Sequence, residues 1–406
     1  MSDSEREKET GSVSGDASPD PGEALIHVAR PLLPSVAELT PLLEDIFSGA
    51  WVTNNGRYLQ QLEEQVADFL DCPRASVVSN GTVALELAVA ALLGLDGPGE
   101  GEAEVITTGF SFPATWHVLL YQAGVKPVFA DIDAGFGLNP DAVPALVTPR
   151  TRAILAVHTY GQPCQLEALA EVAREHKLTL IYDAAHAFGL QVEGKGIANF
   201  GDLSTFSFHA TKGFNTLEGG CVAGPSSSSS LLDRVALERN FGIVSPDEVT
   251  AFGRNGKMDE VRAAIGLLTL PRVQAMVTRR REVTERYLAW FRERNEPELG
   301  INWDFYERDD LVRNYSYFPV RVEPRGRRTR DAVCKRMEAR KIIPRKYFYP
   351  AVTTSPLYRE LCDPADLPET ERAARSVLCL PLHHGLSDHD VERILSAFED
   401  ALEHLD

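Results

Sequence analysis

The stretch Phe206-Ser-Phe-His-Ala-Thr-Lys212-Gly-Phe-Asn-Thr-Leu-Glu-Gly-Gly220 decides how this chain is interpreted. It places Lys212 just after an apolar run typical of a buried strand and just before a pair of glycines. Lysine side chains are nearly always solvated, so a lysine in this context needs a chemical explanation. A lysine can form a Schiff base with an aldehyde cofactor if an acid lies nearby. The stretch Leu180-Ile-Tyr-Asp-Ala-Ala-His-Ala-Phe-Gly189 supplies that acid, Asp183, at the end of another apolar run.

Length and composition indicate a globular protein that is large enough for two domains. The chain has 406 residues, of which 44% are hydrophobic and 25% are charged. Its net charge of −18 argues against non-specific binding to nucleic acid, but not against a small anionic substrate held by local basic groups. We find no apolar run that could span a bilayer and no signal peptide, so no membrane partner is expected. The six cysteines are scattered without a metal-binding spacing, which predicts reduced thiols in a cytoplasmic protein and no metal.

The pattern along the chain predicts a tail and two domains. Residues 1–22 are rich in Ser, Glu, Asp, Gly and Pro and are expected to be disordered. Residues 23–270 are expected to form a large domain, and residues 271–406 a smaller α+β domain. The five serines at 226–230 are interpreted as a polar turn before a helix at Leu231–Arg239.

Short apolar runs alternate with helical stretches in the large domain. The predicted strands are Ser76–Ser79, Val105–Thr108, Pro127–Asp131, Ala153–His158, Leu178–Asp183, Leu203–Phe208 and Cys221–Ala223. The predicted helices between them include Thr82–Leu95, Ala114–Ala123 and Leu166–Lys177. Further on, the pattern predicts helices at Val273–Asn295, Thr329–Arg340 and Asp388–Leu405 and a strand at Tyr315–Val322. Such a chain is expected to form a mostly parallel sheet between helices, with the site at the carboxyl ends of the strands.

Three further segments each allow a functional and a plain interpretation. Asn80-Gly81-Thr82 lies between a strand and a helix, where N–H groups and the helix dipole suit a phosphate, although an ordinary turn with an N-cap also explains it. Phe112 either covers a ligand ring or packs in the core. In Arg345-Lys346-Tyr-Phe-Tyr-Pro350, two cations beside aromatic residues suit a diphosphate and a sugar or base, whereas a basic edge strand is the plain alternative.

Together these segments resemble the DegT/StrS-type family of pyridoxal phosphate (PLP) aminotransferases, which act on nucleotide-linked keto-sugars. The similarity runs from about Ala24 to the C-terminus. It implies the α/β architecture of fold type I PLP-dependent transferases, in which a large domain with a mostly parallel sheet is followed by a smaller α+β domain. It also implies that PLP is the cofactor.

The resemblance implies a role for each candidate residue. Lys212 would hold the cofactor and move the proton, and Asp183 would keep the pyridine nitrogen protonated. The other cofactor contacts implied are Gly81, Thr82 and Ser207 at the phosphate, Phe112 over the ring, His186 near the 3′-oxygen, and Asn240 reaching the phosphate of a neighbouring subunit. A structural histidine is the alternative for His186. Arg345, Lys346 and Tyr347 would contact the substrate.

Other matching segments are less informative. The run Phe252–Glu260 is expected to have a structural role. The turn Trp51–Gly56 matches a turn of the family, and in one interpretation it faces the substrate. His383 and His384 belong either to a loop near the substrate or to the exposed surface, and we favour the surface for His384.

By family precedent, the enzyme would transfer an amino group from L-glutamate to a nucleotide-diphosphate keto-deoxysugar. The segment Tyr347-Phe-Tyr-Pro350 favours C4 of dTDP-4-keto-6-deoxyglucose, with C3 of a dTDP-3-keto-6-deoxysugar as the alternative. A homodimer with shared active sites is implied, because Asn240 would act across the interface. Such aminosugars serve antibiotic glycosylation or surface polysaccharides.

Several other functions agree less well with the sequence. Related dehydratases replace the lysine by histidine, and a non-catalytic PLP-binding sensor would be expected to lose Lys212 or Asp183, but this chain keeps both. A scaffold protein that does not bind PLP would lack the yellow colour of the cofactor. A hydrolase would need a Gly-x-Ser-x-Gly turn and a nucleotide triphosphatase a Gly-x-x-x-x-Gly-Lys loop, and the sequence has neither.

Overall fold

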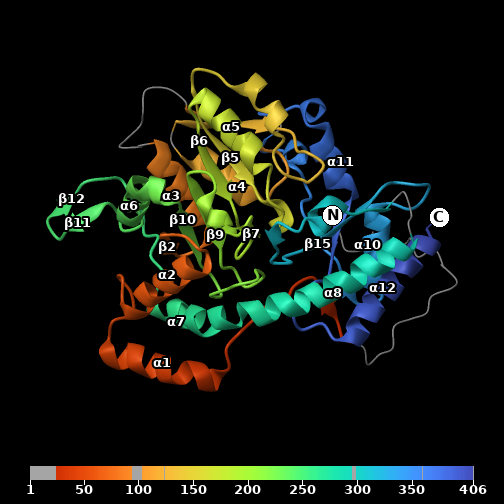
Figure 1. Cartoon of the computed structure of the whole chain (residues 1–406), viewed down its shortest axis with the longest axis horizontal. Coiled ribbons are helices and arrows are strands. Elements are labelled where there is room, and N and C mark those ends of the chain that lie inside the picture. Colours follow the sequence, from red (N-terminus) through yellow and green to blue (C-terminus); the bar gives the residue numbers. More distant parts are fainter. Residues whose placement is uncertain (1–23, 94–102, 123, 295–298, 359, 406) are drawn as a thin grey trace, which may run out of the picture.

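The computed structural model describes residues 24–93, 103–122, 124–294, 299–358 and 360–405. The predicted tail, residues 1–22, lies outside these ranges. A seven-stranded sheet forms the centre of the larger part of the molecule (Figure 1). In spatial order its strands are β2 (Arg74–Val78), β10 (Gly220–Gly224), β9 (Leu203–Ser207), β6 (Thr179–Asp183), β5 (Thr151–Val157), β3 (Ala103–Thr108) and β4 (Val125–Ala130).

The sheet is parallel except for β10. Strand β10 pairs antiparallel with both of its neighbours, whereas β3 pairs parallel with β4 and β5, β5 with β6, and β6 with β9. The carboxyl ends of β5, β6 and β9 therefore lie along one edge. This arrangement confirms the predicted α/β fold, and each predicted strand of this region agrees with the structure to within two residues.

Helices cover both faces of the sheet, so its strands are apolar on both sides. One face packs against α3 (Gly81–Leu93), α4 (Pro113–Tyr121) and α6 (Ser229–Glu238). The other face packs against α2 (Arg57–Phe69), α5 (Leu166–His176) and α7 (Glu260–Thr269). The serine run is only partly a turn, because Ser229 and Ser230 already belong to α6. Serine is well tolerated in the first turn of a helix, where its hydroxyl can bond free N–H groups.

A second core lies in the C-terminal part. Its sheet consists of β13 (Leu299–Gly300), β15 (Phe318–Val322) and β17 (Val377–Leu380), and its helices are α10 (Arg330–Ala339), α12 (Asp388–Glu403) and part of α8 (Val273–Arg294). Residues 315–317 precede β15 rather than belonging to it. Ile26 of β1 (Ile26–His27) joins this core and pairs with β16 (Ile342–Ile343), although it is distant in sequence.

The remaining elements are short or peripheral. They are α1 (Val36–Gly49), α9 (Trp303–Glu307), α11 (Pro368–Ser376), β7 (Gln191–Val192), β8 (Lys195–Gly196), β11 (Ile243–Ser245), β12 (Glu248–Val249) and β14 (Leu311–Val312). Strands β11 and β12 form a hairpin that projects from the body of the molecule (Figure 1). Strand β14 pairs with β7 and thereby joins the C-terminal part to the larger part.

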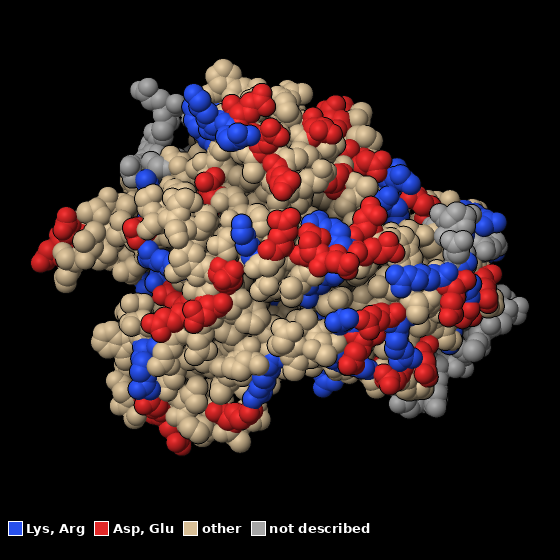
Figure 2. Space-filling model, in the orientation of Figure 1, with Lys and Arg blue, Asp and Glu red and all other residues tan. Residues whose placement is uncertain are grey.

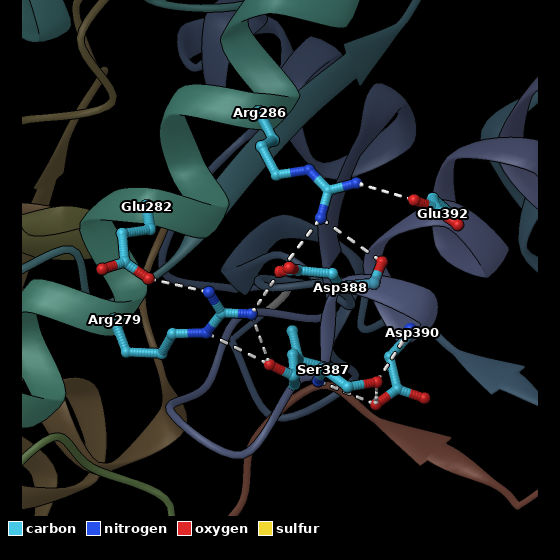
Figure 3. A network of polar contacts seen from close by, with 8 residues as sticks. Arg279, Glu282, Arg286, Ser387, Asp388, Asp390 and Glu392 are labelled. Carbon is cyan, nitrogen blue, oxygen red and sulfur yellow. Dashed lines mark hydrogen bonds and ion pairs between the residues drawn. The ribbon is translucent and has the colours of Figure 1, made fainter.

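Helix α8 contributes to both cores. Val273 and Met276 pack in the larger core, and Val283 and Tyr287 pack in the C-terminal core. Basic and acidic side chains are interspersed on the face of the molecule shown in Figure 2. A network of such side chains fastens α8 to the start of α12, where Arg286 contacts Asp388 at 3.2 Å and Glu392 at 3.4 Å (Figure 3).

Candidate active site

A cavity of about 690 Å³ opens at the carboxyl ends of the central strands. Its walls come from the larger part and from residues of the C-terminal part, including Tyr317. Nine of the eleven predicted site residues line it: Gly81, Thr82, Phe112, Asp183, His186, Ser207, Lys212, Arg345 and Tyr347. The other two, Asn240 and Lys346, do not appear in its lining.

Lys212 lies in the loop that follows β9. The backbone N–H of Lys212 donates to the carbonyl of His209 at 2.8 Å, which forms a tight turn. The ammonium nitrogen lies 5.9 Å from the centre of the Tyr317 ring. Burial lowers the pKa of Lys212 to about 8, although the charge of Asp183 and the nearby Tyr347 phenol oppose this shift. A lysine with this pKa can both give and accept a proton near neutral pH.

Asp183 is the last residue of β6 and is only 6% exposed. Its carboxylate accepts hydrogen bonds from the Thr115 hydroxyl at 2.8 Å and from the N–H of Ala185 at 3.1 Å. Burial raises the pKa of Asp183, whereas Thr115, Ala185 and the charge of Lys212 lower it. No lysine or arginine among the described residues forms a salt bridge with this carboxylate. A protonated pyridine nitrogen fits such a site, because it supplies the missing positive charge.

His186 is buried and held in one orientation. Its Nδ1 accepts a hydrogen bond from the N–H of Tyr160 at 3.1 Å. Its ring stacks on Phe348, with the two centres 5.7 Å apart, and tilts against Tyr317. Burial holds the pKa of His186 well below its ordinary value, so the ring is neutral. Because Nδ1 accepts, Nε2 carries the hydrogen and can donate to a ligand.

The start of α3 and the end of β9 form a cradle for an anion. Gly81 is the first residue of α3, and a Cβ at this position would lie 2.8 Å from the Cβ of Ser207. Only glycine therefore leaves room between the free N–H groups of the helix and the Ser207 hydroxyl. Asn80 caps the helix, since its side chain accepts the N–H of Val83 at 2.9 Å. Both the cradle and the helix dipole suit the phosphate of PLP.

Phe112 does not pack in the core. It is 59% exposed and lines the cavity from the residue just before α4. The alternative in which Phe112 is a core residue is therefore wrong. Proline at the first position of α4 favours this helix start, and it leaves the Phe112 ring at the edge of the cavity.

The segment 345–350 is not a strand, so the alternative of a basic edge strand is also wrong. Arg345 makes an isolated backbone bridge to Cys379, and its guanidinium interacts with Tyr347, 5.9 Å from the centre of that ring. Lys346 pairs with Asp331 at 2.7 Å and lines a neighbouring cavity of about 400 Å³. Phe112, Arg345 and Tyr347 line both cavities, so the two spaces share a wall.

Asn240 follows α6 and lies outside the cavity of its own chain. Its side-chain oxygen accepts a hydrogen bond from Lys257 at 2.9 Å. The hairpin β11–β12 follows directly, and the sequence patterns did not predict it. The role of Asn240 toward a neighbouring subunit stays a prediction.

Three other predicted segments have mainly structural contacts. Glu260 accepts the N–H groups of Tyr58 at 2.8 Å and Leu59 at 3.1 Å, so it caps the start of α2. Trp51 is exposed and does not line the cavity. His383 is buried and His384 is half-buried, so the expectation of an exposed His384 is wrong. Neither histidine lines the cavity.

Some residues that build the site could not be found from the sequence patterns. Thr115, which bonds Asp183, lies on the first turn of α4 and carries no motif of its own. Tyr317 and Phe348 enter from the C-terminal part, and only the packing of the two parts brings them to His186 and Lys212. In the described residues no cluster suitable for a metal ion is found, and no helix could span a membrane.

Comparison with known proteins agrees with this geometry. The model of the DegT/DnrJ/EryC1/StrS aminotransferase family matches residues 35–399. A dTDP-4-amino-4,6-dideoxy-D-glucose transaminase of Shigella dysenteriae is 37% identical over 379 residues, which are 93% of this chain and 99% of that protein. A GDP-perosamine synthase of Vibrio cholerae is 32% identical over 365 residues, 88% of this chain and 94% of that protein.

Solved structures share the same fold. The structure of DesI in the presence of its TDP-sugar product has a TM-score of 0.83 and 34% sequence identity, covering 95% of this chain and 96% of the DesI chain. The cavity, the buried lysine and carboxylate, and the anion cradle all fit PLP, the cofactor of these enzymes. The chain therefore belongs to the DegT/DnrJ/EryC1/StrS aminotransferase family and is a PLP-dependent nucleotide-sugar transaminase.

Proposed function

We propose that this enzyme transfers the amino group of L-glutamate to C4 of dTDP-4-keto-6-deoxyglucose and so forms the dTDP-linked 4-amino-4,6-dideoxy sugar. The observation that carries this proposal is the match, over nearly the full length of both chains, to a protein named dTDP-4-amino-4,6-dideoxy-D-glucose transaminase. The second cavity beside Arg345 and Lys346 also supports it, because a nucleotide-sugar is a long molecule and needs space beyond the cavity that would hold the cofactor.

Lys212 is proposed to hold the cofactor and to move the proton in each half of the reaction. When bound, PLP withdraws electrons from the carbon that carries the amino group, which lets that carbon lose a proton. The Lys212 amine, with a pKa of about 8, can take this proton and return it. Tyr317 covers the amine with its ring, which keeps water away from the moving proton.

Asp183 and His186 are proposed to hold the cofactor from its ring side. Asp183 keeps its negative charge beside a protonated ring nitrogen, and Thr115 and Ala185 fix its two oxygens. His186 presents Nε2–H as a donor, which suits the 3′-oxygen of the cofactor. Gly81, Thr82 and Ser207 are proposed to hold the phosphate, and Phe112 to cover the ring.

The nucleotide-sugar is proposed to lie along the wall that contains Arg345, Lys346 and Tyr347. Arginine forms paired hydrogen bonds to phosphate oxygens, and the aromatic rings offer flat faces to a sugar or a base. Lys346 already pairs with Asp331, so we assign it the weaker contribution. This wall belongs to the C-terminal part and faces Phe112 of the larger part.

A homodimer with shared sites completes the proposal. Phe241, Ile243, Val244, Val249 and Phe252 are exposed apolar side chains on and beside the projecting hairpin, and such patches mark protein interfaces. Asn240 lies next to this patch, where it can reach the phosphate of a partner's cofactor. We also propose a cytoplasmic location, supported by the six free cysteines, because the cytosol keeps thiols reduced.

The proposal is tested with the purified enzyme and PLP in two steps. L-Glutamate should bleach the visible band of the lysine-bound cofactor, and dTDP-4-keto-6-deoxyglucose should then restore it. Nuclear magnetic resonance of the product should show nitrogen on C4. A dTDP-3-keto-6-deoxysugar that restores the band while the 4-keto sugar does not would refute C4 and support C3.

The shared site is tested by subunit mixing. Lys212→Ala and an inactive variant at Asn240 should together regain roughly a quarter of the wild-type rate, because half of the random dimers hold one intact site out of two. If subunit exchange is confirmed by differently tagged chains and activity does not return, Asn240 does not act across the interface.

A further inference from the structure

Two adjacent arginines of α8 are in opposite states. Arg279 is fully engaged: it donates to the carbonyl of Leu386 at 2.8 Å and contacts Asp388 at 2.9 Å and Glu282 at 2.7 Å (Figure 3). Arg280 is only 2% exposed, and within the described residues it has neither a hydrogen bond nor an ion pair. A buried guanidinium without an acceptor is costly, so this side chain requires an explanation.

The loop 382–387 brings further unpartnered groups to the same place. The Nδ1 atoms of His383 and His384 are buried without a partner. Arg30 also has no hydrogen bond or ion pair in the described part of the chain. A Cβ added to Gly385 would lie 3.1 Å from Nη1 of Arg30 and 3.5 Å from Nδ1 of His383. Glycine at position 385 therefore leaves open the space between these two side chains.

Electrostatic effects show that these side chains act on one another. Burial, together with the positive charges of His384, Arg280 and Arg30, lowers the pKa of His383 to about 4. Burial likewise lowers the pKa of His384, together with the charges of Arg280 and Arg30. Asp390 is the acid that acts on His383, but it is already bonded to the N–H and hydroxyl of Ser387 at 2.9 and 2.7 Å.

We infer that Arg280, Arg30, His383 and His384 form a binding site for a small inorganic anion such as chloride. Arg280 supplies the buried charge, the two imidazoles supply N–H donors in the matching tautomer, and Arg30 supplies the exposed entrance. None of the four lines the cofactor cavity, so the site differs from the phosphate cradle.

The position of the site connects it to the catalytic loop. Nη1 of Arg280 lies 3.4 Å from the place that a Cβ on Gly213 would occupy, and Gly213 follows Lys212. Tyr317, which lines the cavity, also lies close enough to influence the pKa of Arg280. A bound anion therefore connects the loop 382–387 to the loop that contains Lys212 and Gly213. It also neutralises the Arg280 guanidinium, which lies between the two loops.

Thermal unfolding of the PLP-loaded enzyme tests this inference. Replacing sodium gluconate by 100 mM sodium chloride at constant ionic strength should raise the Tm of the wild type by about 1–2 °C, if chloride binds with a Kd near ~10 mM. Arg280→Met should remove this rise. The matched control is Arg279→Gln, which loses paired contacts and lowers the Tm in both salts but keeps the rise.

Two further measurements keep the inference testable if Arg280→Met does not fold. Arg30→Gln changes an exposed side chain and should reduce the chloride response without a loss of fold. Crystals soaked in sodium bromide should show an anomalous peak within about 3.5 Å of the Arg280 guanidinium. The inference fails if Arg280→Met responds to chloride as the wild type does, if the bromide peak is absent there, or if a carboxylate of a partner subunit occupies the site.

Discussion

The two walls of the cavity differ in how their polar groups are held. On the wall of the larger part, both oxygens of Asp183 and the Nδ1 of His186 already have hydrogen-bond partners from the protein. On the wall of the C-terminal part, the Arg345 side chain interacts with Tyr347, and Lys346 forms an ion pair with Asp331 near the surface. This difference fits the proposal that the first wall is preorganised for a resident cofactor, whereas the second wall holds cations that a substrate can engage as it comes and goes.

The largest expected effect concerns the preorganised wall. Lys212→Ala should lower the rate of transamination by about 10⁴-fold, because the group that transfers the proton is lost. The variant should still bind PLP, but without the visible band of the lysine-bound form. Lys195→Ala, an exposed lysine of the same part, is the control and should keep both the band and the rate. Retained turnover in Lys212→Ala would assign the chemistry to another group.

A smaller loss is expected for Asp183→Asn. The amide keeps the hydrogen-bonding shape but cannot balance a protonated ring nitrogen, so the rate should fall by roughly 10²–10³-fold. Circular dichroism should show an unchanged fold. The exposed Asp141→Asn is a suitable control. A near-wild-type rate would mean that another group keeps the ring protonated.

The substrate wall should respond in a different kinetic parameter. Arg345→Gln should raise the KM for the nucleotide-sugar by about 10-fold and leave the half-reaction with L-glutamate nearly unchanged, because it removes a contact to the diphosphate. Lys346→Gln should raise the same KM by only about 2–3-fold, since Lys346 pairs with Asp331. If both variants slow the glutamate half-reaction equally, the two walls do not divide the work as we propose.

The smallest expected effect is the pH dependence of the reaction with L-glutamate. Only the neutral amine of Lys212 accepts a proton, and burial lowers its pKa from 10.5 to about 8. The single-turnover rate with L-glutamate should therefore rise severalfold as the pH increases from about 7 to 9 and then level off. Stopped-flow absorbance measures this rate. A profile that still rises in proportion to hydroxide above pH 9 would show that the lysine keeps its ordinary pKa.

The sequence predicts the preorganised wall better than the substrate wall. Strand ends can be located from apolar runs. Local patterns alone therefore predict correctly that Asp183 ends a strand and that Lys212 follows one. Segment 345–350 has no such periodicity, and its irregular backbone depends on contacts with Cys379 and with residues of the larger part. Two-residue pairings such as β1–β16 and β7–β14 carry almost no local signal, because long-range contacts decide them.

The same limit explains the unpredicted details. The hairpin β11–β12 is short and exposed. Its two strands have no alternation of apolar and polar residues that would mark them as strands in the sequence. The state of Arg280 also could not be predicted, because a basic residue on a long charged helix is normally solvated, as Arg281 is beside it. Its burial results from the packing of loop 382–387 and of the loop around Gly213 against α8.

Helix α8 has a mechanical consequence. Its 22 residues form a rod about 33 Å long, and both ends are anchored in different cores. Any rotation of one core against the other would have to bend this rod or extract apolar side chains from one end. The molecule is thus stiff along this axis. A frame of this kind holds Lys212 of the larger part at a constant distance from Arg345 of the C-terminal part.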